Sequence, residues 1–278
     1  ENMSFEVLQK IVDDCKGKSL KKINLFWMGD STVDKNMIEK IRIIRTNLPG
    51  VKLYLSTNAQ LLSEKRSRIL LEENLLDVIN FDIDGLNKNT FEGIRVKLDF
   101  DVVTKNVMYF LNYKKELNKS TPETRVTIID MKPTKDEVSG FIAHWSRYAD
   151  KVDVNHYGTW GGTKDDLNYD HGHIKDEHDF KLTESMTNGF DFACTHPWEE
   201  MVIGADGRVG LCCLDHELNE QVGDVKDKTI EQIWHGDVIN SYRTKMLNLD
   251  YSSIGSCKNC NAHTFQSNKT WAKLQKTN

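Results

Sequence analysis

The sequence predicts an α/β fold that is followed by a small cysteine-ligated domain. Helical and strand-like patterns alternate over residues 1–160, the strand-like runs are short and apolar, and five of the six cysteines lie in the last third of the chain. Alternating helices and strands with short connections are typical of a parallel sheet with crossover helices, in either a barrel or a doubly wound arrangement.

Five runs of strand length predict the sheet. They cover residues 22–28, 51–56, 77–83, 125–131 and 151–156. Apolar spacing predicts helices over residues 5–14, from about 34, and over 63–74, 87–95, 100–117 and 134–149. The series opens with a helix at a residue other than Met, so we expect that a strand and its preceding segment are missing upstream of Glu1.

The composition of the 278 residues excludes several classes of protein. Hydrophobic residues make up 38% and charged residues 28%, and the formal net charge is −5. This charge argues against a nucleic-acid or acidic-membrane partner, because phosphate binding needs clustered Lys and Arg. The sequence contains neither an apolar run of about 20 residues nor an apolar export segment. We therefore expect a cytoplasmic protein, where thiols stay reduced.

Polar or glycine-rich residues follow four of the predicted strands, at positions 29–30, 57–58, 82–84 and 156–160. Ligands of parallel sheets gather at the carboxyl ends of the strands, so these residues predict one shared rim. The alternative is that they are ordinary turn residues. Residues 161–192 are rich in Asp, His, Lys and Gly and predict a linker, where His171, His173 and His178 are expected to be solvated rather than metal ligands.

The late cysteines have the spacing of a metal site. Cys194 and Cys212 are single, whereas Cys257 and Cys260 form a Cys-x-x-Cys knuckle. A predicted hairpin with its turn at residues 205–207 would bring Cys212 towards Cys194, and a helix over 229–247 would return the chain to the knuckle. Four thiolates suit zinc and iron–sulfur clusters equally. Cys213 is spare, as a small buried residue or a neighbour of the ligands, and Cys15 stands alone.

Several motifs occur in a fixed order along the chain. CTHPWEEMVIGADGRVGLCCLD over residues 194–215 is followed by GDV at 223–225, IEQIW at 230–234 and CKNC at 257–260. Upstream lie GDS at 29–31, STN at 56–58 with LL at 61–62, DIDG at 82–85 and IR at 94–95. Over about residues 3–265 the chain resembles radical S-adenosylmethionine (radical SAM) enzymes with a C-terminal SPASM or twitch domain.

The resemblance implies a partial (β/α)6 barrel that lacks its first strand. Members of this family reduce S-adenosylmethionine at a [4Fe–4S] cluster on a Cys-x3-Cys-x2-Cys loop, and the resulting 5′-deoxyadenosyl radical abstracts a hydrogen atom from the substrate. The implied domains are the truncated barrel (1–160), a linker (161–192), the auxiliary-cluster domain (193–265) and a tail (266–278). The residues implied to bind S-adenosylmethionine are Gly29, Asp30, Ser31, Thr57, Asn58, Asp82 and Arg95. Those implied to hold an auxiliary [4Fe–4S] cluster are Cys194, Cys212, Cys257 and Cys260.

The chain departs from the family pattern at two places. The Cys-x3-Cys-x2-Cys loop does not occur in it, so this chain alone is expected to be inactive, and a second cluster is expected only in the full-length protein. Gly29-Asp30-Ser31 stands where the family has Gly-Glu-Pro, which shortens the carboxylate arm. No cysteine follows Cys260, so one auxiliary cluster of the twitch type is expected.

Two functions follow from these patterns. The first is a radical SAM oxidoreductase or modifying enzyme that acts on a sugar-like small molecule or a peptide and receives electrons from a flavodoxin or a ferredoxin. The second is a degenerate barrel that acts as a binding or scaffold protein and keeps a structural four-cysteine zinc site. The catalytic residues are unknown in both cases.

Overall fold

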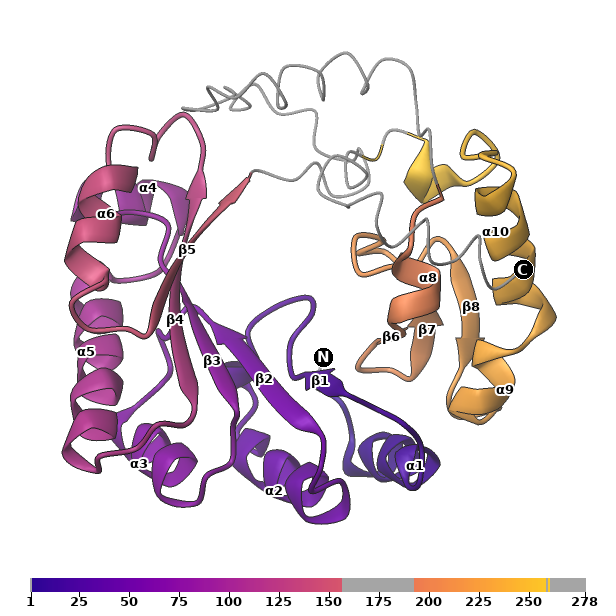
Figure 1. The fold of residues 1–278 in the computed structure, drawn as a ribbon, viewed down its shortest axis with the longest axis horizontal. Helices are drawn as coiled ribbons and strands as arrows, with labels where there is room; N and C mark the ends of the chain where they lie inside the picture. Colours follow the sequence, from indigo (N-terminus) through magenta and orange to yellow (C-terminus); the bar gives the residue numbers. More distant parts are fainter. Residues whose placement is uncertain (1, 157–192, 259, 261–278) are drawn as a thin grey trace. The chain divides into compact units, whose positions relative to one another are not determined.

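The computed structural model describes residues 2–156, 193–258 and 260. These residues belong to two compact units (Figure 1). The first contains the described residues from Cys15 to His156, and the second contains residues 2–14 with the described residues from Ala193 onward. Among the described residues, every helix is too short or too polar to cross a lipid bilayer.

The first unit is built on a parallel five-stranded sheet. Its strands are β1 (Lys22–Asn24), β2 (Lys52–Thr57), β3 (Val78–Asp82), β4 (Glu123–Asp130) and β5 (Lys151–His156). They pair in sequence order, and the register aligns Ser56 with Asn80 and Asp82 with Thr127. The carboxyl ends of the strands therefore meet at one edge, as the alternating sequence pattern predicts.

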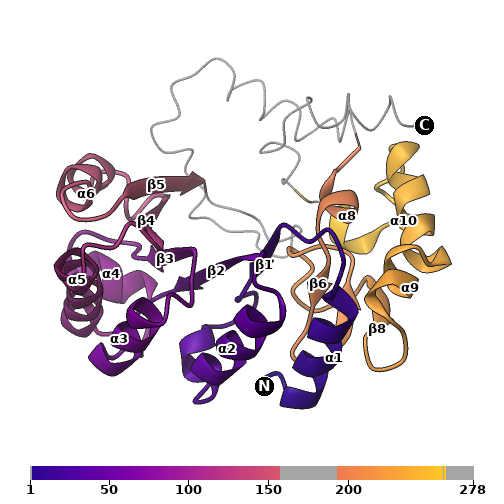
Figure 2. The ribbon, with the colours of Figure 1, turned by 60° about the horizontal axis from the view of Figure 1, so that its bottom comes forward.

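Five helices lie along one side of this sheet, as Figures 1 and 2 show. They are α2 (Met37–Asn47), α3 (Glu64–Glu72), α4 (Lys88–Ile94), α5 (Phe100–Glu116) and α6 (Val138–Trp145). A doubly wound sheet has helices on both faces, so the arrangement of the described helices favours the partial barrel. Side-chain caps begin two of them, since Ser63 accepts a hydrogen bond from Arg66 N and Asp99 accepts from the amides of residues 101 and 102.

The two faces of the sheet differ sharply in polarity. The helix-facing side chains of the central strands are fully buried and apolar: Leu53, Leu55, Ile79, Phe81, Val126 and Ile128. The ring of Phe81 packs edge-on against that of Phe110 in α5, with 5.5 Å between their centroids. On the opposite face the same strands present Ser56, Asn80, Asp82 and Thr127. Parallel strands are usually apolar on both faces, so this polar face suits ligand binding.

The first strand is shorter than the sequence pattern predicts. Residues 22–28 suggest a buried strand, but β1 ends at Asn24, and Lys22 and Asn24 are exposed. The chain then turns into the 3₁₀ helix η1 (Ser31–Val33), because Asp30 caps that helix and the Ser31 hydroxyl donates to Leu25 O. The local hydrogen bonds of Asp30 and Ser31 therefore form in place of a longer β1.

The second unit begins with helix α1 (Phe5–Cys15) and continues with the cysteine-rich segment. It contains α8 (His196–Glu199), the antiparallel strands β6 (Val202–Ile203), β7 (Arg208–Gly210) and β8 (Gln221–Asp224), and then α9 (Ile230–Trp234), α10 (Asp237–Leu247) and η2 (Gly255–Cys257). Val7 of α1 is buried in one apolar cluster with Val209, Val222 and Ile233. The carboxylate of Asp14 accepts a hydrogen bond from Ile230 N at 3.0 Å.

The hairpin predicted around residues 205–207 is present. β6 and β7 pair through Val202 with Gly210 and Ile203 with Val209. Gly207 has φ +93°, a left-handed conformation that glycine adopts without strain, and Asp206 accepts from Arg208 N.

The single helix expected over 229–247 is instead two helices. Gly236 is extended, with φ −73° and ψ 161°, and it separates α9 from α10. A Cβ at this position would lie 2.8 Å from Gln232 O, so the tight break needs glycine.

Candidate functional site

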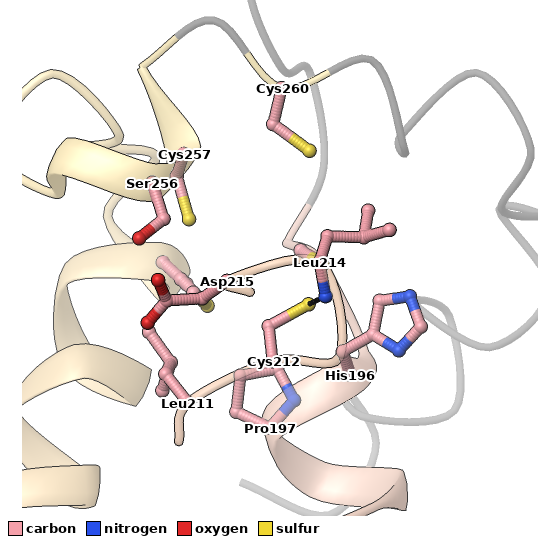
Figure 3. Close-up of a pocket in the computed structure, with 11 residues that line it drawn as sticks. His196, Pro197, Leu211, Cys212, Leu214, Asp215, Ser256, Cys257 and Cys260 are labelled. Atoms are coloured by element: carbon pink, nitrogen blue, oxygen red, sulfur yellow. Dashed lines mark hydrogen bonds between the residues drawn. The ribbon is translucent and has the colours of Figure 1, made fainter. Parts of the chain in front are cut away.

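Four cysteines from separate segments of the second unit line one cavity (Figure 3). Cys194 precedes α8, Cys212 follows β7, Cys257 ends η2, and Cys260 lies three residues further on. Cys194 and Cys257 are buried, while Cys212 and Cys260 are half-buried. The remaining wall is mainly apolar, from Pro197, Leu211, Leu214 and Met246, with polar contributions from His196, Asp215 and Ser256. Cys15 and Cys213 are not part of this lining.

Hydrogen bonds hold the segments that carry the cysteines. The backbone N–H of Cys194 donates to the Tyr251 hydroxyl at 2.7 Å. The buried carboxylate of Asp215 accepts from the amides of Asn219 and Glu220 and so folds the loop that follows Cys212. Glu220 in turn accepts from Ser256 N next to Cys257. The positions of the cysteines are therefore set by the protein itself.

The thiols of the cavity lie close enough to oppose one another's ionisation. Burial raises the pKa of the Cys257 thiol, and the neighbouring sulfurs of Cys260, Cys194 and Cys212 raise it further. Clustered thiolates in an apolar cavity repel one another unless a bound cation neutralises their charge. The donor set therefore has the electrostatics of a metal or cluster site.

Cys212 differs from Cys257 in its surroundings. A hydrogen bond from the Cys213 thiol outweighs burial and lowers the pKa of Cys212 to about 7, helped by His196 and by Leu214 N, which lies 3.4 Å from the Cys212 sulfur. Burial alone would lower the pKa of His196, but its contact with Glu200 (Nδ1–Oε1 2.7 Å) and the charge of Cys212 raise it to about 8.

These neighbours form a second possible ligand set. One ligand atom from each of His196, Cys212 and Cys213 lies within 4.8 Å of the other two. Of its two cysteines only Cys212 lines the four-cysteine cavity, which His196 also lines, and imidazole with thiolates is a donor set that zinc prefers.

In the first unit, Asp30 joins the carboxyl ends of β1 and β2. Its carboxylate accepts hydrogen bonds from Thr32 N (2.8 Å) and Thr32 Oγ1 (2.6 Å). It also accepts from Thr57 Oγ1 (2.8 Å) and Asn58 N (2.8 Å). The structure thus brings together Asp30, Thr57 and Asn58 as expected. Both oxygens of the Asp30 carboxylate therefore already accept hydrogen bonds from within the protein. The backbone of the neighbouring Gly29 is in the left-handed conformation, with φ +90°.

Asp82 lies in a hydrogen-bonded row on the polar face of the sheet. It accepts from Ser56 Oγ and from Asn80 Nδ2, both at 2.7 Å. Asn80 Oδ1 accepts from Thr127 Oγ1 at 2.6 Å, so the row crosses three strands. Burial raises the pKa of Asp82 to about 6, although the hydrogen bond from Ser56 and the charge of Arg95 oppose this rise.

Arg95 forms an ion pair with Asp84 rather than with Asp82. The distance from Arg95 Nη2 to Asp84 Oδ2 is 2.6 Å, and Asp84 also accepts from Ile129 N. The buried Arg95 Nε has no hydrogen-bond partner among the described residues. The guanidinium of Arg95 therefore keeps one donor that its ion pair with Asp84 does not use.

Comparison with known protein families now identifies the cysteine-rich segment. Residues 194–261 match the model of the SPASM iron–sulfur cluster-binding domain. These residues form a SPASM domain. The resemblance stated from residues 194–215 and the CKNC motif is confirmed by this match, which includes all four cavity cysteines.

Part of the chain is similar to a GTP 3′,8-cyclase from Desulforamulus reducens. The two are 30% identical over 107 residues, which is 38% of this chain and 32% of the cyclase. The match therefore spans about a third of the length of that relative.

Several solved structures are similar in fold to most of this chain. BtrN in complex with AdoMet and 2-DOIA has a TM-score of 0.57 and 16% identity, over 94% of this chain and 81% of BtrN. Native anSMEcpe with bound AdoMet and the Cp18Cys peptide has a TM-score of 0.65 and 18% identity, over 94% and 79%. The chain therefore shares the fold of these two proteins, and the α/β fold predicted from the sequence, a partial barrel with a small C-terminal domain, is confirmed.

The residues of the SPASM domain fit an iron–sulfur cluster. Four thiols converge on a largely apolar cavity, which is the donor set that such clusters require. The Ser256 hydroxyl on the cavity wall is buried and has no hydrogen-bond partner among the described residues, so it can serve a bound group.

Sequence reasoning did not find several residues of this site. His196, Glu200, Tyr251 and Ser256 have no spacing signal of their own, although His196 lies only two residues after Cys194. Asp84 shares a strand end with Asp82, but nothing in the sequence pairs it with Arg95. The histidines at 171, 173 and 178 and the side chains of residues 156–160 lie outside the described side chains.

Proposed function

We propose that this chain is the body of a radical SAM enzyme, an oxidoreductase or modifying enzyme whose SPASM domain holds one auxiliary [4Fe–4S] cluster of the twitch type. The observation that carries the proposal is the single cavity lined by Cys194, Cys212, Cys257 and Cys260 in a SPASM domain. When bound, such a cluster supplies one-electron transfer next to the substrate.

The predicted rim supports S-adenosylmethionine as the co-substrate. Asp30 fixes the ends of β1 and β2 through Thr57 and Asn58, which makes the rim rigid. Asp82 on the polar face and the spare donor of Arg95 are then the charged groups suited to a ligand with hydroxyl, amino and carboxylate groups. Gly29 and Ser31 complete the proposed binding set.

We place the enzyme in the cytoplasm, with a flavodoxin or a ferredoxin as electron donor and a sugar-like molecule or a peptide as substrate. Radical generation would depend on a Cys-x3-Cys-x2-Cys loop, which the printed residues do not contain.

The decisive experiment measures iron, sulfide and zinc in the chain after anaerobic purification and reconstitution. About four irons and four sulfides per chain, as in one [4Fe–4S] cluster, are expected. Equilibrium binding of S-adenosylmethionine to the same sample tests the rim, and Arg95→Gln is expected to weaken it about tenfold or more, as for a lost charged hydrogen bond.

A scaffold that holds zinc at His196, Cys212 and Cys213, rather than at the four cysteines expected from the sequence, is the second candidate, because one ligand atom from each of these three residues lies within 4.8 Å of the other two. It predicts about one zinc per chain, no sulfide and no binding of S-adenosylmethionine. It also predicts that His196→Ala removes the metal, whereas the enzyme hypothesis predicts that His196→Ala leaves the iron content unchanged.

A further inference from the structure

The adjacent thiols of Cys212 and Cys213 face different surroundings. The Cys212 sulfur lines the cluster cavity with Cys194, Cys257 and Cys260, but Cys213 is absent from that lining (Figure 3). The sulfur of Cys213 instead lies against Cys212 and Glu200. The Cys213 thiol has one proton, and because Glu200 already contacts the imidazole of His196, that proton can be donated to the Cys212 sulfur.

The Cys212 sulfur consequently receives two donors. One is the Cys213 thiol, and the other is Leu214 N at 3.4 Å. The imidazole of His196 lies within 4.8 Å of the same sulfur and is held in place by Glu200. Around Cys257, by contrast, burial and the neighbouring sulfurs dominate. Cys212 and Cys257 are therefore unequal, because the sulfur of Cys212 has hydrogen-bond donors next to it.

We propose that Cys213 is a positioning residue whose thiol donates a hydrogen bond to the Cys212 sulfur and thereby raises the reduction potential of the auxiliary cluster. This inference rests on the proposed iron–sulfur site. It assigns a role to Cys213, which is not one of the four proposed ligands. Donors to a ligand sulfur stabilise the reduced cluster, which carries the more negative charge, and hydrogen bonds to sulfur are among the factors that set these potentials.

The test compares Cys213→Ala, Cys213→Ser and Cys15→Ala in the full chain after anaerobic reconstitution. Iron and sulfide are measured first, and then the potential, by following the EPR signal of the reduced cluster during a redox titration. All three variants are expected to keep the iron content of the unchanged chain, because Cys213 and Cys15 lie outside the cavity lining.

The reduction potential of the auxiliary cluster should distinguish the three variants. Cys213→Ala removes the donor and is expected to favour the oxidised cluster about tenfold, a shift of ~59 mV towards negative potential for one electron. Cys213→Ser keeps a donor and should stay near the unchanged chain, as should Cys15→Ala.

Three outcomes would overturn the inference. An unshifted potential in Cys213→Ala with iron retained rejects the hydrogen bond but leaves the cluster site intact. Loss of iron in Cys213→Ala while Cys15→Ala keeps it would show that Cys213 is a ligand. Absence of iron from the unchanged chain would reject the proposed function together with this inference.

Discussion

At the scale of single residues, the SPASM cavity separates cysteines that the sequence cannot rank by spacing alone. Cys212 and Cys213 are neighbours in the chain, yet only Cys212 lines the cavity. The ligand choice made from the sequence agrees with that lining. It could be made because residues 194–215 and the CKNC motif resemble the SPASM domain, whereas His196 and Ser256 enter the site through the fold and have no spacing signal of their own.

Removing a cavity cysteine should remove the metal. Cys212→Ala and Cys257→Ala are each expected to lower the iron content from about four per chain to below one, since three thiols hold such a cluster poorly. Inductively coupled plasma analysis of the reconstituted protein measures this. Cys15→Ala is the matched control and should keep its iron, and equal losses in all three variants would contradict the assigned ligands.

The raised pKa of Asp82 should make the free energy of unfolding depend on pH. Its pKa is raised from 3.8 to about 6, so between these values the native state binds more protons than the unfolded state. The free energy of unfolding therefore falls as the pH rises through that window. Asp82→Asn removes this dependence, and the variant should gain about 1–3 kcal/mol relative to the unchanged chain between about pH 4 and pH 8.

Urea denaturation at about pH 4 and pH 8 measures how much the stability of Asp82→Asn gains over the wild type. Asp34→Asn is the control variant. Hydrogen bonding and charge from Lys40 outweigh burial and hold the pKa of Asp34 below 3.8. Its stabilising contribution is therefore present above that value and is lost only at more acidic pH. For Asp34→Asn, the change in the free energy of unfolding relative to the wild type should be the same at both pH values. If the change for Asp82→Asn is also the same at both, the pKa of Asp82 is not raised.

At the scale of elements, the strands were predictable where apolar residues alternate with polar ones. β2, β3 and β4 lie within two residues of their predicted bounds, because Leu55, Phe81 and Ile128 must face the helices. The early end of β1 at Asn24 was not predictable, since the chain turns there towards the capped 3₁₀ helix η1, and the position of Asp30 depends on contacts with Thr57 and Asn58 that are distant in sequence. The break at Gly236 likewise depends on a close approach to Gln232 O.

Asp30 should matter for stability as well as for binding. Asp30→Asn replaces one acceptor oxygen by a donor and leaves two of the four donor groups around it without an acceptor, so a loss of about 1.5–3 kcal/mol is expected. Chemical denaturation measures the loss, with the exposed Glu39→Gln of α2 as control. A variant as stable as the unchanged chain but weaker in binding S-adenosylmethionine would instead assign Asp30 directly to the ligand.

At the scale of the whole molecule, α1 belongs to the SPASM-containing unit although it precedes the sheet in sequence. Its periodicity predicts an apolar face but cannot say which partner covers that face, and the sequence pattern groups residues 1–160 together. Val7→Ala should loosen the second unit by about 1.5 kcal/mol, at roughly 0.8 kcal/mol for each lost CH₂. Faster hydrogen exchange at the Val209 and Val222 amides measures this, and the exposed Glu6→Gln should leave both unchanged.

The hydrogen bond between Asp14 and Ile230 joins residues that are 216 positions apart. At 5–20 residues per second, a ribosome needs roughly 10–40 s to make the intervening chain. During that interval α1 has already been synthesised while its apolar partners do not yet exist, although the sheet can assemble from neighbouring segments. The helix must therefore be kept from wrong associations until the last cysteines have been translated, so slower elongation or scarce chaperones would reduce the yield of the cluster domain before that of the sheet.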